Sequence, residues 1–282
     1  MTDLLALPEI QTGAIPFLAS LLSALVFLAV RQSWVVAGGL VGFYASAMAM
    51  GVFDLSPTRS VNRVLLLGIV FLVVAIGLNL TPASKDRGNL NSTARGALIG
   101  LVAAATCWLI WSATLRQGMP QALMTFLFAA AYAGWLIHMI ASGGLDTLRK
   151  LSATCFLALS TGICVVLGAS ALLGQLAISM GVACGALLLI ATFRKQADVD
   201  STLIVPVVVV VTSLGVAGVV FAKVTWVTLL ILAAIPLAVR LPVPQAWPRL
   251  AQSALISAFA VAVGGSASFL AWWQNMQSAS YY

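Results

Sequence analysis

A succession of long apolar segments limits the fold of this chain more than any other feature. A membrane-spanning helix needs about 20 mostly apolar residues, because each residue rises ~1.5 Å through a hydrocarbon layer of ~30 Å. Ten segments approach this length, at residues 13–30, 34–53, 64–80, 96–115, 119–142, 151–170, 173–193, 201–221, 224–239 and 250–273. We therefore predict an all-α polytopic membrane helix bundle with about ten transmembrane helices, of which the ninth is the weakest.

Charged residues are too scarce for a water-soluble fold. Only 7% of the 282 residues are charged and 62% are hydrophobic, whereas soluble domains carry about 25% charged residues. The longest internal loop, predicted at residues 81–95, is a solvated turn rich in Asn, Ser and Gly and is too short to fold by itself. We therefore expect a single integral membrane domain over residues 1–282, whose function is performed inside the bundle or at its two faces.

The sixth and seventh segments are not separated by any charge. Together they form one apolar run of 43 residues, 151–193, about twice the length that a straight spanning helix needs. Gly168, Ser170 and Gly174 are the turn-forming residues near its middle. We therefore predict a tight turn between residues 168 and 174, with one helix on each side.

The distribution of Lys and Arg predicts how the chain inserts, because these residues are retained on the cytoplasmic side. If the N-terminus is outside, ten of the fourteen fall in inner loops: Arg31, Lys85, Arg87, Arg95, Arg149, Lys150, Arg194, Lys195, Arg240 and Arg249. The outer loops hold Arg59, Arg63, Arg116 and Lys223. Most of this asymmetry comes from the second half of the chain. We expect both termini outside, in a bacterial inner membrane.

The basic residues have a topological explanation and do not indicate a nucleic-acid partner. The formal net charge is +7, but the cations stand singly or in pairs at span ends, where they meet lipid headgroups. A dedicated polybasic lipid site needs clusters of about 4 to 8 cations. The N-terminal tail has Asp3 and Glu9 but no Lys or Arg, so it lacks the basic region of a cleavable signal peptide and the first span is expected to be retained.

Ten spans divide into two sets of five, which suggests an inverted repeat of residues 1–143 and 144–282. The first three span starts of the two sets differ by 137 to 139 residues, although ten ordinary helices with short loops give similar spacing. In length and helix count the chain resembles the drug and metabolite transporter superfamily, whose members are commonly built from two five-helix halves. No motif of that family occurs here, and its usual cytoplasmic termini differ from the external termini that the Lys and Arg distribution predicts. No functional residue of the family is therefore assigned to this chain.

Carboxylates are absent from the predicted spans. All seven lie in loops or at span ends: Asp3, Glu9, Asp54, Asp86, Asp146, Asp198 and Asp200. Ionisable residues inside spans normally mark ion and proton pathways, since a charge at the bilayer centre costs about 2.5 to 3.5 kcal/mol on insertion scales. We therefore expect no ion coupling through a buried Asp or Glu.

Three residues are candidates for a substrate path. His138, the single histidine, lies near the end of the fifth span and could line a polar path, although an interfacial imidazole is the more ordinary explanation. Gln175 follows the predicted turn and could instead cap a helix. Pro206 lies inside the eighth span, where proline frees a carbonyl group; such broken helices sometimes form substrate sites but more often are kinks.

No pattern in the sequence indicates catalysis, a cofactor or a metal site. The four cysteines, Cys107, Cys155, Cys164 and Cys184, lack C-x-x-C spacing, which favours a packing role. One histidine cannot supply both axial ligands of a bis-histidine haem. Gly168-Ala169-Ser170 resembles a serine in a small-residue turn, but no base is near it in the sequence. We expect no enzyme activity, no catalytic residues and no cofactor.

Small residues occur at helical spacing in several spans and can allow close packing in lipid. The steps are Gly38 with Gly42, Gly96 with Gly100, and Gly181 with Gly185, together with a patch at Gly264-Gly265-Ser266. Packing within the chain is the favoured explanation, and an oligomer interface is the alternative.

Two functions remain open on the sequence alone. The first is a transporter or permease for a small neutral or amphipathic solute, which should have a central cavity. The alternative is a non-catalytic membrane subunit or scaffold of an inner-membrane complex, whose partner is another membrane protein.

Overall fold

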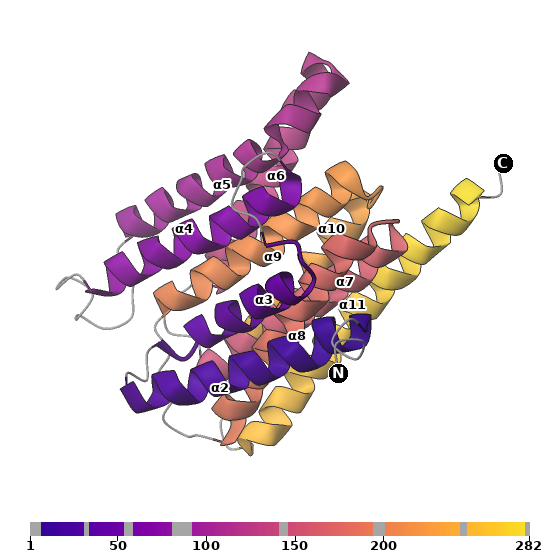
Figure 1. Ribbon diagram of the computed structural model, residues 1–282. Helices are drawn as coiled ribbons and strands as arrows, with labels where there is room; N and C mark the ends of the chain where they lie inside the picture. The colour runs from indigo at the N-terminus through magenta and orange to yellow at the C-terminus, as the bar shows by residue number, and fades with distance from the viewer. Residues whose placement is uncertain are drawn as a thin grey trace.

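In the computed structural model the chain is a bundle of helices (Figure 1). The structure describes residues 7–30, 34–53, 59–80, 92–140, 146–193, 201–242 and 247–279, and these contain helices and no strand. The helices are η1 (Ile10–Ala14), α2 (Ile15–Val30), α3 (Ala37–Ala49), α4 (Ser60–Leu80), α5 (Ser92–Thr114), η4 (Leu115–Gln117), α6 (Met119–Ile140), α7 (Thr147–Leu167), α8 (Ala171–Phe193), α9 (Ser201–Phe221), α10 (Trp226–Leu232), η5 (Ile235–Arg240) and α11 (Arg249–Ala279). The predicted all-α bundle is confirmed.

Each of the ten predicted segments contains a helix. The helices of the second and ninth segments are the shortest. Eight helices are long and apolar enough to cross a membrane, so the chain is an integral membrane protein by this criterion. Of the shorter two, α3 has 13 residues and α10 with η5 covers residues 226–240. The predicted loop at 81–95 is wrong at its end, because α5 begins at Ser92; residues 81–91 lie outside the described residues.

The short ninth segment runs the whole length of α7. Its start lies at the C-terminal end of α7, where a Cβ on Gly168 would be 2.7 Å from Val224 Cγ2. Its end lies at the other end of α7, where Arg149 Nη1 donates to the Leu241 carbonyl oxygen (3.0 Å). The 3-10 turn of η5 lengthens this crossing, because its rise of ~2.0 Å per residue exceeds the ~1.5 Å of an α-helix.

Contacts between neighbouring helices place the helix ends on two faces. In the hairpin of α5 and α6, Cys107 lies beside Phe126 and Arg95 beside His138, so the two helices are antiparallel. In the pair of α7 and α9, Gly168 lies beside Ala222 near the two C-terminal ends, so these are parallel. We call the face with Glu9, Arg63, Arg116, Gly168 and Lys223 the terminal face, and the face with His138, Asp146, Arg149 and Arg240 the opposite face.

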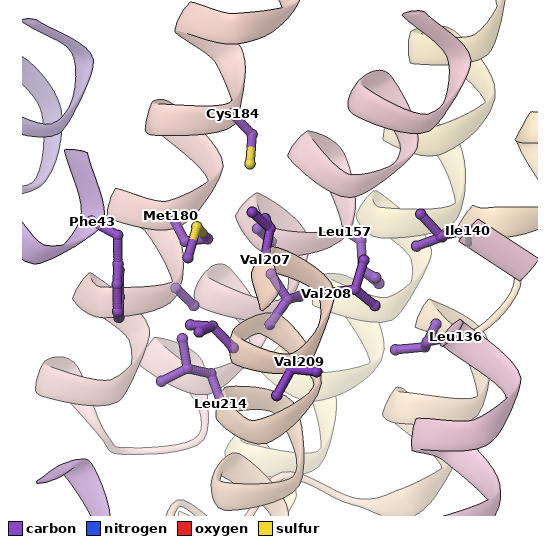
Figure 2. Close-up of a cluster of buried hydrophobic side chains, with 14 of the residues drawn as sticks. Phe43, Leu136, Ile140, Leu157, Met180, Cys184, Val207, Val208, Val209 and Leu214 are labelled. Atoms are coloured by element: carbon purple, nitrogen blue, oxygen red, sulfur yellow. The ribbon is translucent and has the colours of Figure 1, made fainter. Parts of the chain in front are cut away.

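Helix α9 lies in the middle of the bundle, between α4 and α7 (Figure 1). Its run from Val207 to Val211 is at most 1% exposed. Figure 2 shows Val207, Val208, Val209 and Leu214 among side chains of α3, α6, α7 and α8, including Phe43, Leu136, Leu157 and Met180. A helix that is apolar on all sides is expected at such a central position.

The predicted turn between the sixth and seventh segments is confirmed at residues 168–170, where Ala169 has a φ of +79°. Helices α7 and α8 then pack closely through glycines. A Cβ on Gly174 would be 2.8 Å from the Gly162 carbonyl oxygen and 2.9 Å from the Val166 amide nitrogen. Any side chain at Gly174 would therefore separate the two helices.

The short segments occupy different places in the two predicted halves. In residues 1–143 the short helix is the second of five, and in residues 144–282 it is the fourth. The repeat stays a prediction. Of the seven carboxylates, Glu9 and Asp146 are described and both lie at helix ends, as predicted; Asp146 caps α7 by accepting from the Leu148 amide. The other five lie outside the described residues.

Candidate functional site

The break between α10 and η5 is the first component of the candidate site. Pro236 has no N–H to donate to the carbonyl of Leu232, so the α-helical hydrogen bonding ends there. The chain continues through a turn at residues 233–234 into η5. The Ala233 carbonyl oxygen accepts from Trp135 Nε1 of α6 (2.9 Å), which ties the break to a neighbouring helix.

The break lies near the middle of the bundle. A Cβ built on Gly264 of α11 would collide with the Ser160 side chain and would lie 4.0 Å from Ile235 Cδ1. Ser160 is near the middle of α7, and Gly264 is near the middle of α11. Three crossings therefore approach one another at this depth, and one of them is discontinuous.

Two buried hydroxyl groups lie beside α10. Tyr132 of α6 and Thr161 of α7 are 6% and 1% exposed, and neither hydroxyl oxygen has a hydrogen-bond partner. A Cβ on Gly215 of α9 would be 3.5 Å from Thr161 Cγ2, 3.6 Å from Tyr132 Oη and 3.1 Å from Leu229 Cδ2. The absence of a side chain at Gly215 therefore allows α6, α7, α9 and α10 to approach one another closely here.

The hydroxyl groups are unusual because burial of an unpaired hydroxyl is unfavourable. Mutational data place this penalty at about 1–3 kcal/mol. Several other buried hydroxyls of the bundle are paired; Thr106, for example, donates to the Val102 carbonyl oxygen (2.8 Å). Ser213 of α9 is a further buried hydroxyl without a partner. A polar atom of a bound molecule could supply the partner that Tyr132 and Thr161 lack in this closed arrangement.

A line of small polar residues between α7 and α11 continues from this cluster. Ser152 Oγ lies 3.2 Å from Ser257 Oγ, and Cys164 Sγ lies 3.7 Å from Ser268 Oγ. Cys164 is one turn beyond Thr161 on α7. The interface of α7 with α11 is therefore lined by groups that can form weak, exchangeable hydrogen bonds.

The three candidates predicted from the sequence lie on different helices and at different depths. His138 is exposed near the opposite face, and its backbone carbonyl accepts a hydrogen bond from Arg95 Nη2. Gln175 is half-buried in α8 near the terminal face, and Pro206 is buried in α9 toward the opposite face. The structure does not bring them together. Their role in a substrate path stays a prediction.

The sequence signal for the candidate site was weak but present. The ninth segment stood out as the weakest span, and Pro236 lies within it. Tyr132 and Thr161 carried no such signal, because hydroxyl residues are common in spans and their neighbours on other helices cannot be read from spacing.

The cysteines and other ligating residues form no metal centre within the described ranges. All four cysteines are free, and no group of three or more His, Cys, Asp or Glu side chains there could hold a metal ion. Cys155 Sγ lies 3.2 Å from the Gly181 carbonyl oxygen, at the interface of α7 and α8.

Comparison of the chain with protein-family models, curated proteins and solved structures finds no match.

Proposed function

We propose that this integral membrane protein is a permease for a small neutral solute that bears hydrogen-bonding groups. The observation that carries the proposal is the pair of unpartnered hydroxyls, Tyr132 Oη and Thr161 Oγ1, buried at a discontinuous helix. Discontinuous helices near the middle of the membrane commonly form substrate sites in transporters. The proposal includes no chemical reaction on the solute.

The chemistry of the cluster favours a neutral substrate. Tyr132 and Thr161 each offer one donor and acceptor lone pairs, and neither carries a charge at neutral pH. The carboxylates that the structure describes, Glu9 and Asp146, lie at helix ends away from this depth. A cationic substrate would therefore enter an apolar interior without a compensating negative charge from these groups, which is strongly unfavourable.

Transport through this site requires the bundle to open. The hydroxyls are nearly inaccessible in the described arrangement, so the structure corresponds to a closed state in this proposal. The break at residues 233–234 separates α10 from η5, and each segment can move without bending a continuous helix. Movement of α10 would open the cluster toward the terminal face, and movement of η5 toward the opposite face.

A permeability assay tests the proposal directly. Purified protein is reconstituted in liposomes, and uptake of glycerol, erythritol and urea is followed by light scattering after rapid mixing. We expect faster entry of at least one solute than in protein-free liposomes. Thr161→Val should reduce this protein-dependent rate roughly tenfold, as expected if it removes one hydrogen bond worth about 1.4 kcal/mol. Thr106→Val, at a buried hydroxyl outside the cluster, is the matched control.

Native cysteines provide a second readout that does not depend on the choice of solute. Variants that retain either Cys164, one turn from Thr161, or Cys184, which is fully buried on α8, are treated in vesicles with a membrane-impermeant thiosulfonate. We expect Cys164 to react from both faces and Cys184 to stay unreactive. The proposal would be overturned if neither thiol reacts and every solute enters the liposomes no faster than it enters protein-free liposomes.

A second candidate function is a non-catalytic membrane subunit, and one observation favours it. Gly96 and Gly100 form a small-residue step on α5, and a Cβ on either would meet nothing within 4 Å. Such a surface can pack against another helix, from a second copy or from a partner protein. Purification in a mild detergent would support this function if another membrane protein, or a second copy, stays bound and Gly100→Leu releases it.

A further inference from the structure

A cavity of about 190 Å³ opens at the terminal face, and none of its lining residues belongs to the break in the ninth crossing. Its lining comes from the start of α4, the end of α5 with η4, and the end of α9. The lining residues are Ser60, Arg63, Ser112, Ala113, Arg116 and Phe221. Two guanidinium groups and two hydroxyl groups thus share one cavity with an aromatic ring.

Arg63 is held in place by α5. Its Nη1 donates to the Leu109 carbonyl oxygen and to Ser112 Oγ, both at 3.2 Å. Its guanidinium carbon lies 5.4 Å from the centre of the Trp108 ring, within the range of a cation–π interaction. These contacts orient the guanidinium group at the wall of the cavity. Arg116, on η4, is exposed at the same cavity.

The remaining cations of this face are close to the cavity along the chain. Arg59 is one turn before Arg63, whose amide donates to the Arg59 carbonyl oxygen (3.2 Å), and Lys223 follows the lining residue Phe221 by two residues. Neither Glu9 nor Asp146, the described carboxylates, lines the cavity. Of the four cations that the sequence assigns to this side of the membrane, two therefore line the cavity, and the other two are close to its lining residues along the chain.

We infer that this cavity binds a phosphate group. Paired guanidinium groups match phosphate oxygens, and serine hydroxyls add neutral donors. Phe221 is 41% exposed and suits the apolar part of a phospholipid. The phosphate can come from a phospholipid headgroup of the same leaflet or from a soluble phosphate, and both present the same chemistry to Arg63 and Arg116.

The test measures binding by thermal stabilisation, since a ligand of the folded state raises the unfolding temperature. The full chain in a neutral detergent is titrated with short-chain phosphatidylglycerol or with diacylglycerol of the same acyl length. Inorganic phosphate and chloride are compared at equal ionic strength. The unfolding temperature is read from tryptophan fluorescence. The variant is Arg116→Gln, and its matched control is Arg240→Gln, which removes one exposed arginine from the opposite face.

We expect phosphatidylglycerol to stabilise the wild type and R240Q, whereas R116Q should bind it roughly tenfold more weakly, the loss expected for a hydrogen bond to a charged group. Diacylglycerol should have no such effect. Stabilisation by inorganic phosphate that is also lost in R116Q assigns the site to a soluble phosphate.

Equal responses of R116Q, R240Q and the wild type would overturn the inference, because a general attraction of basic faces to anions would then explain the binding. Absence of any phosphate-dependent shift in the wild type would also overturn it. Ser112→Ala supplies an independent variant, with an expected weakening of a fewfold. The unfolding temperature of each variant without ligand shows that it is folded.

Discussion

At the scale of single residues, the bundle contains buried hydroxyl groups with a hydrogen-bond partner and buried hydroxyl groups without one. Thr212 of α9 donates to the Val208 carbonyl oxygen at 2.7 Å, a bond within its own helix. Thr161 and Tyr132 are equally buried but have no partner. The paired hydroxyl is stabilising or neutral, whereas an unpaired hydroxyl is retained at the expense of stability.

This contrast predicts opposite effects of the same substitution. Thr161→Val removes an unpaired hydroxyl at nearly constant volume, and we expect it to raise the free energy of unfolding by about 1 kcal/mol. Thr212→Val removes a paired hydroxyl, and we expect a loss of about 0.5–1 kcal/mol. Unfolding in a denaturing detergent, measured for both variants, checks the signs. A destabilised Thr161→Val would show that its hydroxyl is paired in the folded protein.

At the scale of elements, the hairpin of α7 and α8 depends on glycines that admit close helix approach. The apolar sequence of residues 151–193 explains why both helices enter the membrane, but lipid offers no hydrophobic driving force to join them. Their association instead rests on backbone proximity at Gly162, Gly174 and Gly181, where a Cβ would lie within 3.0 Å of neighbouring backbone atoms.

Gly174→Ala should therefore destabilise the protein by about 1–3 kcal/mol, the range found for overpacked cores. Gly100→Ala is the control, because a Cβ there meets nothing within 4 Å and alanine is the better helix former by about 1 kcal/mol. Unfolding temperatures of the two variants should move in opposite directions. A neutral Gly174→Ala would contradict the close packing of this hairpin.

The ninth crossing shows how a weak element is held by its neighbours. Trp135 of α6 and Arg149 of α7 donate to carbonyl groups at the break and at the end of η5, respectively. The first donor satisfies a carbonyl that a continuous helix would pair internally, and the second satisfies a carbonyl at the C-terminal end of η5.

Trp135→Phe keeps an aromatic ring but removes the donor to the Ala233 carbonyl oxygen. We expect a loss of about 1 kcal/mol in stability, the usual net value of one hydrogen bond. Trp111→Phe is the control, because Trp111 is also an exposed tryptophan and its ring stacks on Phe126. Thermal unfolding of both variants should separate the effect of losing the Nε1 donor from the effect of the smaller ring. Equal losses of stability in the two variants would argue against the hydrogen bond from Trp135 to Ala233.

At the scale of the whole molecule, the alternation of helix directions assigns the charges to two faces. Described cations at the opposite face include Arg95, Arg149 and Arg240, and those at the terminal face include Arg63 and Arg116. Because α3 and the α10–η5 segment both act as crossings in this arrangement, the first described helix begins and the last described helix ends at the terminal face. We propose, from the excess of Lys and Arg, that this face is outside the cell.

Reporter fusions test this topology. We expect alkaline phosphatase to be active when fused to the C-terminus and to the loop after residue 116, and inactive when fused after residue 193 or residue 242. Green fluorescent protein should show the reverse pattern. Termini on opposite sides would mean that one of the two short segments does not cross. A complete inversion of the pattern would refute the proposed orientation and leave the bundle unchanged.

The membrane class of the protein and the approximate positions of its crossings could be predicted from the amino-acid sequence, because membrane insertion depends on the composition and length of each segment. Turn residues also predicted a turn between residues 168 and 174, which the structure has at 168–170, and residues 224–239 were predicted as the weakest span. These properties are local, so one segment can be judged without its neighbours.

The contacts between side chains of different helices could not be predicted from the sequence and are seen only in the folded bundle. In lipid, all faces of an apolar helix are nearly equivalent, so periodicity does not reveal which face is buried or against which helix. The choice depends on shape and on small residues at close approaches. The cluster of Tyr132, Thr161 and Gly215 and the cavity of Arg63 and Arg116 each join helices distant along the chain. Their sites follow from this packing and not from local sequence.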